Sequence, residues 1–397
     1  MHAISLLNSW LERNAVIGHR SRQNALLRVV EALLDGGKLA LTHLGRARRG
    51  NAFIKHHIKA VDRLLGNPHL HNERRGIYAA LCSMLLARAE RPIIAVDWCD
   101  CELGRELLIL KAAVPIGGRA ISVYEEVHPM RRYNSPRTHR RFLERFHQMV
   151  PVHCRPIIVT DAGFRGPWFR DVEALGWDWI GRIRNTIKYL QPETQRWCDI
   201  RSLYHQATPR IRHLGVHCLS PRQRYWFRLY LVRAYQRRPG RPRKRKLYSS
   251  NDRLYRRLHR APWLLATSLP HHRGAGNLIK RAYTRRMEIE ETFRDLKSHR
   301  WGFALRYAQT KNPRRLEMLL LIAVLATLIL WLLGLATKAR QWERHFQANT
   351  ERRRSVLSTV FLGREILRNH RLTITRGELS DSLLQLKYLV ATHGTLA

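Results

Sequence analysis

An uncharged run of 19 residues, Met318–Ala336 (MLLLIAVLATLILWLLGLA), constrains the fold more than any other feature of this sequence. Its length lies at the lower edge of what a transmembrane helix needs. Basic residues flank both ends, namely Arg314, Arg315, Lys338 and Arg340, so the flanking charge favours neither orientation in a membrane. The alternative is a helix that is buried on all sides in the core of a large α/β domain. We expect the buried helix.

The charge of the chain is strongly one-sided. The 397 residues include 72 Lys and Arg but only 30 Asp and Glu, which gives a net charge of +42. Such a charge repels itself unless a polyanionic partner offsets it, so we expect nucleic acid first and an anionic membrane surface second. An ordinary metabolic enzyme for small neutral substrates is disfavoured. With 45% hydrophobic residues the chain can bury a core, and its length predicts two or three domains.

Six cysteines are too few for a disulfide scaffold, and they show no CxxC…CxxC or CxxC…HxxxH spacing. We therefore expect buried thiols in a reducing cytoplasm. A zinc site formed by Cys99-x-Cys101 with His153-Cys154 is the alternative to buried thiols. The N-terminal residues contain no basic segment followed by a sustained apolar segment, so no secretory signal is expected.

The first 75 residues are predicted to be helical. Apolar residues recur at helical spacing between Leu26 and Leu34, and a later segment, Ala52–Leu65, is rich in Lys, His and Arg. Short helices joined by glycine turns, with a basic last helix, are typical of helix-turn-helix DNA-binding domains. The alternative is a basic face that only contacts solvent.

Two short apolar runs each end in an aspartate. Residues 92–97 end at Asp97, and residues 156–161 end at Asp161. Both runs read as buried strands, and a hairpin (107–124) and a basic amphipathic helix (138–150) lie between them. We therefore expect an α/β fold in which two strands carry an aspartate at their C-terminal ends.

Residues 184–262 do not fit a regular α/β alternation, although residues 225–232 are strand-like. They contain a basic loop, 237–246 (RRPGRPRKRK). Residues 238–244 resemble an AT-hook, in which Arg241 and Arg243 would enter a narrow A·T minor groove. The alternative is a solvated loop that makes non-specific phosphate contacts.

A helix is predicted from about Leu278 to Ser298. Four of its residues lie within about 60° of one another at ~100° per residue and therefore form one stripe: Tyr283, Arg286, Glu290 and Lys297. One phenol, one acid and two cations are not a core face, and they suit a surface that contacts a metal ion and phosphates. The alternative is a face of i,i+4 salt bridges, because Arg286–Glu290 and Glu290–Arg294 have that spacing.

Three carboxylates, those of Asp97, Asp161 and Glu290, are candidates for one site. Carboxylates brought together repel strongly unless cations neutralise them. Mg²⁺ suits such a site, since it takes few protein carboxylates and completes its ligands with water and phosphate oxygens. Two such ions about 3.5–4 Å apart can stabilise the attacking and leaving oxygens of an in-line phosphoryl displacement.

The spacing Tyr283-x2-Arg286-x3-Glu290-x6-Lys297 resembles the YREK signature of bacterial insertion-sequence DDE transposases, the family of insertion sequences four and ten. YTRRMEIEETFRDLKS (283–298) is similar to the helix that carries the third acid of that family. IIAVDWCD (93–100) and IIVTDAGFRGPWF (157–169) resemble the strands of its two aspartates. Residues 55–67 and 345–360 are similar to its N- and C-terminal segments, so the resemblance covers nearly the whole chain.

The resemblance implies a transposase that moves an insertion sequence by cut-and-paste transposition, with metal-dependent nicking, hairpin formation and strand transfer at the element ends. Asp97, Asp161 and Glu290 would bind two Mg²⁺ ions, with Mn²⁺ as a substitute. Contacts to phosphates near the transposon end would come from Tyr283, Arg286 and Lys297. Trp263, in the WLLAT segment, would stack on a flipped base; its alternative is a core tryptophan. Double-stranded DNA, as transposon ends and as target, is the implied partner, and the implied assembly is a homodimer in a synaptic complex.

The predicted fold is an RNase H-like α/β catalytic core with a β-rich insertion, preceded by an all-helical DNA-binding domain. The predicted domains are a helical N-terminal DNA-binding domain (1–75), a first part of the core with both Asp strands (76–183), the β-rich insertion (184–275), a second part of the core with the Glu290 helix and the buried apolar helix (276–340) and a C-terminal helical region (341–397). We expect a cytoplasmic, nucleoid-associated bacterial protein without a membrane partner. Three alternatives remain, namely an RNase H-like nuclease without strand transfer, a non-catalytic or inactive DNA-binding relative, and a membrane protein.

Overall fold

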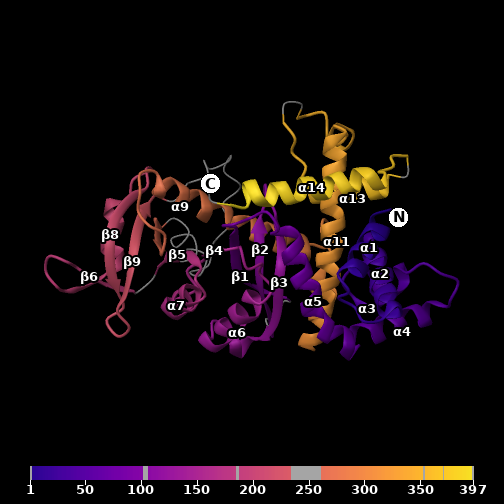
Figure 1. The fold of residues 1–397 in the computed structure, drawn as a ribbon, viewed down its shortest axis with the longest axis horizontal. Coiled ribbons are helices and arrows are strands. Elements are labelled where there is room, and N and C mark those ends of the chain that lie inside the picture. The colour runs from indigo at the N-terminus through magenta and orange to yellow at the C-terminus, as the bar shows by residue number, and fades with distance from the viewer. Residues whose placement is uncertain are drawn as a thin grey trace, which may run out of the picture. The chain divides into compact units, whose positions relative to one another are not determined.

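The computed structural model describes residues 2–101, 106–184, 187–233, 261–351, 354–369 and 371–395. The chain forms two compact units (Figure 1). Unit 1 combines Met1–Pro156 with Arg286–Ala397, and unit 2 is the intervening segment Ile157–Arg285. Unit 1 is therefore discontinuous in sequence.

Most of the helices belong to unit 1, and their starts follow local capping rules. Asn67 caps one helix with Pro68 at its first position, and Thr375 forms a capping box with Glu378 at another. The described helices of unit 1 are α1 (His2–Arg13), α2 (Arg20–Leu34), α3 (Leu41–Ala47), α4 (Ile54–Leu65), α5 (Pro68–Leu85), α6 (Pro136–His147), α10 (Met287–Lys297), α11 (Pro313–Ala339), α12 (Glu343–Phe346), α13 (Thr359–Arg368) and α14 (Arg376–His393), with 3₁₀ turns η1 (Met130–Arg132) and η3 (Leu305–Tyr307).

Helix α11 contains the uncharged run and forms the core of unit 1. Among the described helices it alone is long and apolar enough to cross a membrane, yet 94% of its most apolar stretch is buried inside the protein. It contacts α13, α14, α2 and strand β3 (Ala120–Pro129), and α13 and α14 lie across it (Figure 1). A helix enclosed in this way is apolar on every face because every face contacts protein.

Unit 1 also contains three antiparallel strands in the order β3-β2-β1, with β1 at Ile93–Asp100 and β2 at Leu107–Pro115. The turn between β2 and β3 contains Gly117 and Gly118, both at positive φ, which favours glycine. The prediction that the first strand ends at Asp97 is wrong. Pairing with β2 continues to Asp100, so Asp97 lies within the strand.

Unit 2 is dominated by strands. Their order is β4-β5-β10-β9-β8-β6-β7, and only the β4–β5 pair is parallel. The strands are β4 (Ile157–Thr160), β5 (Asp178–Ile183), β6 (Lys188–Leu190), β7 (Trp197–Asp199), β8 (Arg212–Leu219), β9 (Tyr225–Val232) and β10 (Trp263–Thr267), and the helices are α7 (Gly166–Ala174), the 3₁₀ helix η2 (Ile200–Gln206) and α9 (Ala275–Arg285). The predicted basic loop 237–246 lies outside the described residues.

The compact units do not coincide with the predicted domains. The N-terminal helices are in one unit with α11 and contact it through α1, α2, α4 and α5. The single helix predicted from about Leu278 to Ser298 is two helices, α9 and α10, separated by Arg286. There the Ile289 N–H donates to the Arg286 carbonyl three residues back, which tightens the chain locally. DNA binding by residues 1–75 stays a prediction.

Candidate active site

Asp97 lies on a strand that is buried on both sides. Its neighbours Ile94, Ala95 and Val96 are fully buried, and the Asp97 side chain is 14% exposed. One carboxylate oxygen, Oδ1, accepts the Trp98 N–H at 2.8 Å. The strand therefore presents a largely desolvated carboxylate, and such a group needs a charged or hydrogen-bonding partner.

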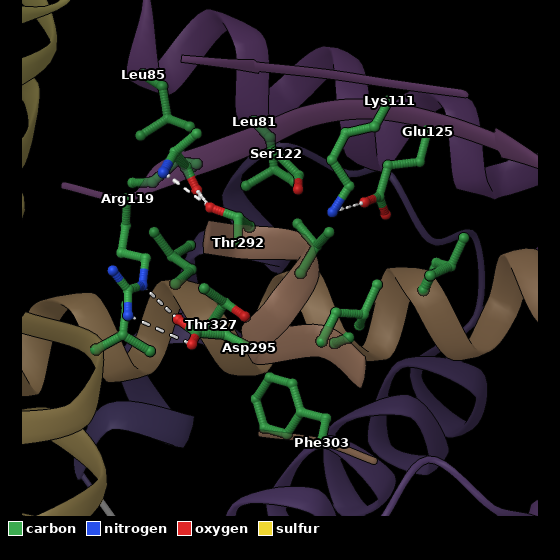
Figure 2. Close-up of a pocket in the computed structure, with 18 of the residues that line it drawn as sticks. Leu81, Leu85, Lys111, Arg119, Ser122, Glu125, Thr292, Asp295, Phe303 and Thr327 are labelled. Atoms are coloured by element: carbon green, nitrogen blue, oxygen red, sulfur yellow. Dashed lines mark hydrogen bonds and ion pairs between the residues drawn. The ribbon is translucent and has the colours of Figure 1, made fainter. Parts of the chain in front are cut away.

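Helix α10 is fixed against the β2–β3 hairpin by polar contacts (Figure 2). The Thr292 hydroxyl accepts the Ala120 N–H at 2.9 Å, and the Arg119 Nε lies 2.6 Å from the Asp295 carboxylate. A cavity of about 40 Å³ lies beside these contacts, lined in part by Thr292 and Asp295. These contacts set the position of α10 and therefore that of Glu290, which is exposed on the same helix.

Arg286 contacts both candidate carboxylates of unit 1, those of Asp97 and Glu290. Its Nη1 lies 2.8 Å from Asp97 Oδ2, and its Nη2 lies 2.7 Å from Glu290 Oε1. The Arg286 side chain is 8% exposed, whereas that of Glu290 is 45% exposed. One guanidinium therefore neutralises a largely buried and a half-exposed carboxylate, with its planar fork directed at both.

Lys297 forms a second ion pair between α10 and β1. Its Nζ lies 2.5 Å from Asp100 Oδ1. Burial alone would lower the pKa of Lys297, but the Cys99 thiol and the Asp100 carboxylate outweigh burial and raise it. Burial would raise the pKa of Asp100, and the Lys297 hydrogen bond and charge lower it instead. Lys297 is therefore charged, and it ties the end of α10 to the end of β1.

A buried ion pair lies next to Asp97, and sequence reasoning missed it. Asp97, Lys111 and Glu125 are paired in register across β1, β2 and β3, so their side chains lie on one face of the sheet. The Lys111 Nζ lies 2.6 Å from the Glu125 Oε1, and each of the two side chains is 2% exposed (Figure 2). The Phe293 ring of α10 lies 4.8 Å from Lys111 Nζ. The sequence contains a signal for this buried pair, because Lys111 is the only charged residue in the apolar segment 107–114.

The other predicted site residues that the structure describes belong to unit 2. Asp161 directly follows β4, and its Oδ1 accepts the Gly163 N–H at 2.8 Å. Trp263 is the first residue of β10 and is half-buried, and its ring lies 5.0 Å from the ring of Tyr283 at an angle of 70°. Tyr283 is 3% exposed. Arg241 and Arg243 lie outside the described residues.

Residues 110–328, more than half of the chain, match the family described as the transposase DDE domain. The chain belongs to this family. No curated protein matches it. The matched range includes Asp161 and Glu290, whereas Asp97 precedes it. Membership implies nuclease or transesterase activity on DNA, and the mixed α/β structure fits an RNase H-like transposase core.

Transposases of this family generally use divalent metal ions. Within the described residues, no group of three or more His, Cys, Asp or Glu side chains could hold a metal ion. The donor set itself suits a hard cation, since the oxygens of Asp97 and Glu290 converge on one positive group. In the transposase described here that group is the Arg286 guanidinium, so a metal ion would compete with Arg286 for these carboxylate oxygens.

Proposed function

We propose that this transposase moves an insertion sequence by cut-and-paste transposition. It would nick the element end, form and reopen a hairpin, and transfer the freed 3′-end into target DNA. The observation that carries the proposal is the convergence of Asp97 and Glu290 on one cation in a chain that belongs to the DDE family. The net charge of +42 supports a polyanionic substrate.

Asp97, Asp161 and Glu290 would bind two Mg²⁺ ions, or Mn²⁺ in their place. When bound, such ions make water or a 3′-hydroxyl more nucleophilic and stabilise the charge of the leaving oxygen.

The remaining residues of the signature would position the DNA. Arg286, once released from the carboxylates, carries five N–H donors in a geometry that suits a phosphate. Lys297 would contribute a point charge beside it. Trp263 would stack on a flipped base, with the buried Tyr283 ring packed against it.

We also propose the finer assignments that follow from the YREK spacing. The protein would act as a homodimer that pairs two element ends in a synaptic complex, in the bacterial cytoplasm and associated with the nucleoid. The N-terminal helices would contact DNA through basic residues of α4, such as Lys55, Lys59 and Arg63. Two other functions compete with this proposal: a nuclease without strand transfer, and a DNA-binding protein without catalysis.

A cleavage assay tests the proposal. Purified protein is incubated with duplex DNA that carries the parent element's end, with and without Mg²⁺, and the products are resolved on a denaturing gel. We expect end-specific nicks and hairpins that require Mg²⁺. Glu290→Gln should abolish them, because the variant loses a ligand charge.

Glu291→Gln is the matched control, since it removes the same charge from the next residue of α10, where Glu291 pairs with Arg294. Its cleavage should equal that of the parent protein. Nicks without joined products in a strand-transfer assay would favour the nuclease. Tight binding without any cleavage would favour the DNA-binding protein and overturn the proposed catalysis.

A further inference from the structure

A polar hollow of about 230 Å³ lies at the start of α6 in unit 1. Four arginines line it, together with Ser135 and Thr138: Arg132, Arg137, Arg141 and Arg145. Three of the four follow one another at intervals of four residues along α6, so they form one stripe on the helix. Like charges at this spacing destabilise a helix unless an anion lies between them.

Among the residues that the structure describes, one acid, Glu126, lines the hollow, and it is already neutralised. Glu126 accepts hydrogen bonds from Arg145 at 2.9 Å and from Tyr124 at 2.5 Å, and its other oxygen lies 2.9 Å from His128. Burial would raise the pKa of Glu126, but these hydrogen bonds outweigh burial and lower it to about 2. In the part of the chain that the structure describes, Arg132, Arg137 and Arg141 have no carboxylate partner.

The start of α6 adds neutral donors to the same hollow. Ser135 is the N-cap residue, yet its side chain makes no capping hydrogen bond, and Pro136 follows it. Thr138 is 7% exposed and lines the hollow, and its hydroxyl has no hydrogen-bond partner among the described residues. A hydroxyl without a partner on a largely buried residue, beside arginines without carboxylate partners and the positive end of a helix, is an arrangement that suits an anion with several oxygens.

The hollow is also tied to the strand of Asp97. Trp98 packs its ring 5.7 Å from the ring of His128, which lines the hollow, and its indole N–H donates to His139 of α6 at 3.0 Å. An anion that binds the start of α6 would therefore be held at a fixed position relative to β1.

We propose that this hollow binds a backbone phosphate of duplex DNA, at a site separate from the carboxylates of Asp97 and Glu290. The inference rests on the proposed function in so far as the phosphate belongs to the DNA substrate. Arg132, Arg137 and Arg141 are exposed at the rim, so a phosphate within a polymer can reach them. The site fixes the register of the duplex, since phosphate contacts position a protein without reading its sequence.

The salt dependence of DNA binding tests this proposal. The affinity for a random-sequence duplex is measured without divalent ions over a series of NaCl concentrations. Each lost phosphate contact lowers the slope of log K against log[NaCl] by about one. Arg141→Ala should therefore lower the slope by about one, and Arg137→Ala/Arg141→Ala should lower it by no more than about one, because both arginines line the site of the same phosphate.

Arg140→Ala is the matched control, because Arg140 is an exposed arginine of the same helix that does not line the hollow. Its slope should equal that of the parent protein. Equal slopes for Arg140→Ala and Arg141→Ala would overturn the proposal, whether both fall or neither does. Unchanged circular dichroism and Tm show that each variant folds.

Two further results distinguish this inference from binding of free phosphate and from the proposed catalysis. If inorganic phosphate stabilises the parent protein but not Arg141→Ala while the DNA slopes agree, the hollow binds free phosphate and the DNA proposal is overturned. A reduced slope for Arg141→Ala in a protein that cleaves no element end supports the inference and overturns the proposed catalysis. Cleavage of the element end, together with equal slopes for Arg140→Ala and Arg141→Ala, supports the proposed catalysis and overturns the inference about the hollow.

Discussion

At the scale of single residues, Arg286 is the centre of the site in unit 1. Two carboxylates from elements far apart in sequence approach each other because one guanidinium lies between them. Without a cation they would repel, and Asp97 would be a largely buried charge without a charged partner. Arg286 therefore stabilises the folded protein in the absence of metal and competes with metal for the same oxygens.

This competition predicts the behaviour of Arg286→Gln. Without divalent ions the free energy of unfolding should fall by about 2–4 kcal/mol, because two hydrogen bonds between charged groups are lost. Mg²⁺ should then raise the Tm of the variant more than that of the parent protein. Thermal unfolding with and without Mg²⁺ measures both effects. Arg294→Gln, which changes an exposed arginine of the same helix, is the control, and an equal response of Arg286→Gln and the parent protein to Mg²⁺ would contradict the competition.

His139 predicts a dependence of stability on pH. Burial, with a smaller effect of His128, lowers its pKa from 6.5 to about 4. Between these values the unfolded chain binds the proton and the folded protein does not. Stability is therefore complete above about pH 6.5 and falls by up to about 3 kcal/mol as the pH decreases to about 4.

Denaturant unfolding at a series of pH values between these limits measures this loss. His139→Gln, which retains an acceptor for the Trp98 N–H, should give a flatter profile. The lowered pKa of Glu126 takes effect around and below its ordinary value of 4.5, so it contributes only at the acid end of this window. A variant with the same slope as the parent protein would show that His139 is not the responsible group.

Sequence reasoning predicted single residues where the relevant contact is local. The pair Arg286–Glu290 has i,i+4 spacing and forms at 2.7 Å. Glu290–Arg294 has the same spacing, but Arg294 pairs with Glu291 instead. The contact of Arg286 with Asp97, and that of Lys111 with Glu125, depend on the register of strands and on the packing of α10. Spacing along the chain does not contain that information.

At the scale of elements, α11 and α13 pack with their backbones in close contact. A Cβ atom at Gly334 would lie 1.9 Å from the Thr359 carbonyl oxygen, and one at Gly363 would lie 2.0 Å from that of Leu330. Both glycines are required because neither backbone can move without opening the core. The contact is short because it has no side chain between the two helices at these positions.

Gly334→Ala should therefore lower the free energy of unfolding by about 1–3 kcal/mol, since the methyl group forces α11 and α13 apart. Chemical denaturation measures the change. Gly377→Ala is the matched control, because Gly377 is an exposed helical residue with nothing closer than 4.0 Å to its Cβ position. That variant should be as stable as the parent protein or more so, owing to the higher helix propensity of alanine. Equal losses in both would contradict the packing argument.

Strands and helices were predictable where their patterns were long, and their ends were not. The apolar runs before Asp97 and Asp161 are strands, but β1 extends to Asp100 because its partner β2 continues to pair with it. The predicted helix from about Leu278 to Ser298 divides at Arg286 although every residue there tolerates a helix. Pairing with β2 decides the end of β1, and it acts between residues that the local pattern does not connect.

At the scale of the whole molecule, unit 2 is inserted into unit 1. The predicted boundaries at residues 183 and 275 follow changes of composition, whereas the compact units divide at Pro156 and Arg285. The amino-acid composition shows where a strand-rich segment replaces alternating strands and helices. The boundaries of a compact unit depend instead on which elements pack together.

The enclosure of α11 predicts how the protein behaves with lipid. The full chain should remain at the bottom of a density gradient when it is mixed with vesicles of zwitterionic phosphatidylcholine. These vesicles carry no net charge, so they do not attract a protein of charge +42 electrostatically. Flotation of the folded protein with the vesicles would show that α11 is available to a bilayer, contrary to its burial.

Helix α11 also imposes an order on biosynthesis. Two of the segments that cover it, α13 and α14, follow it in the chain, so the ribosome releases a long apolar helix before its cover is complete. During that interval part of the apolar surface of α11 is exposed, and exposed apolar surface favours aggregation. A copy of the gene truncated before residue 359 would never complete the enclosure. Its product would be degraded or aggregate, and it would not persist as a DNA-binding fragment that competes with the full-length protein.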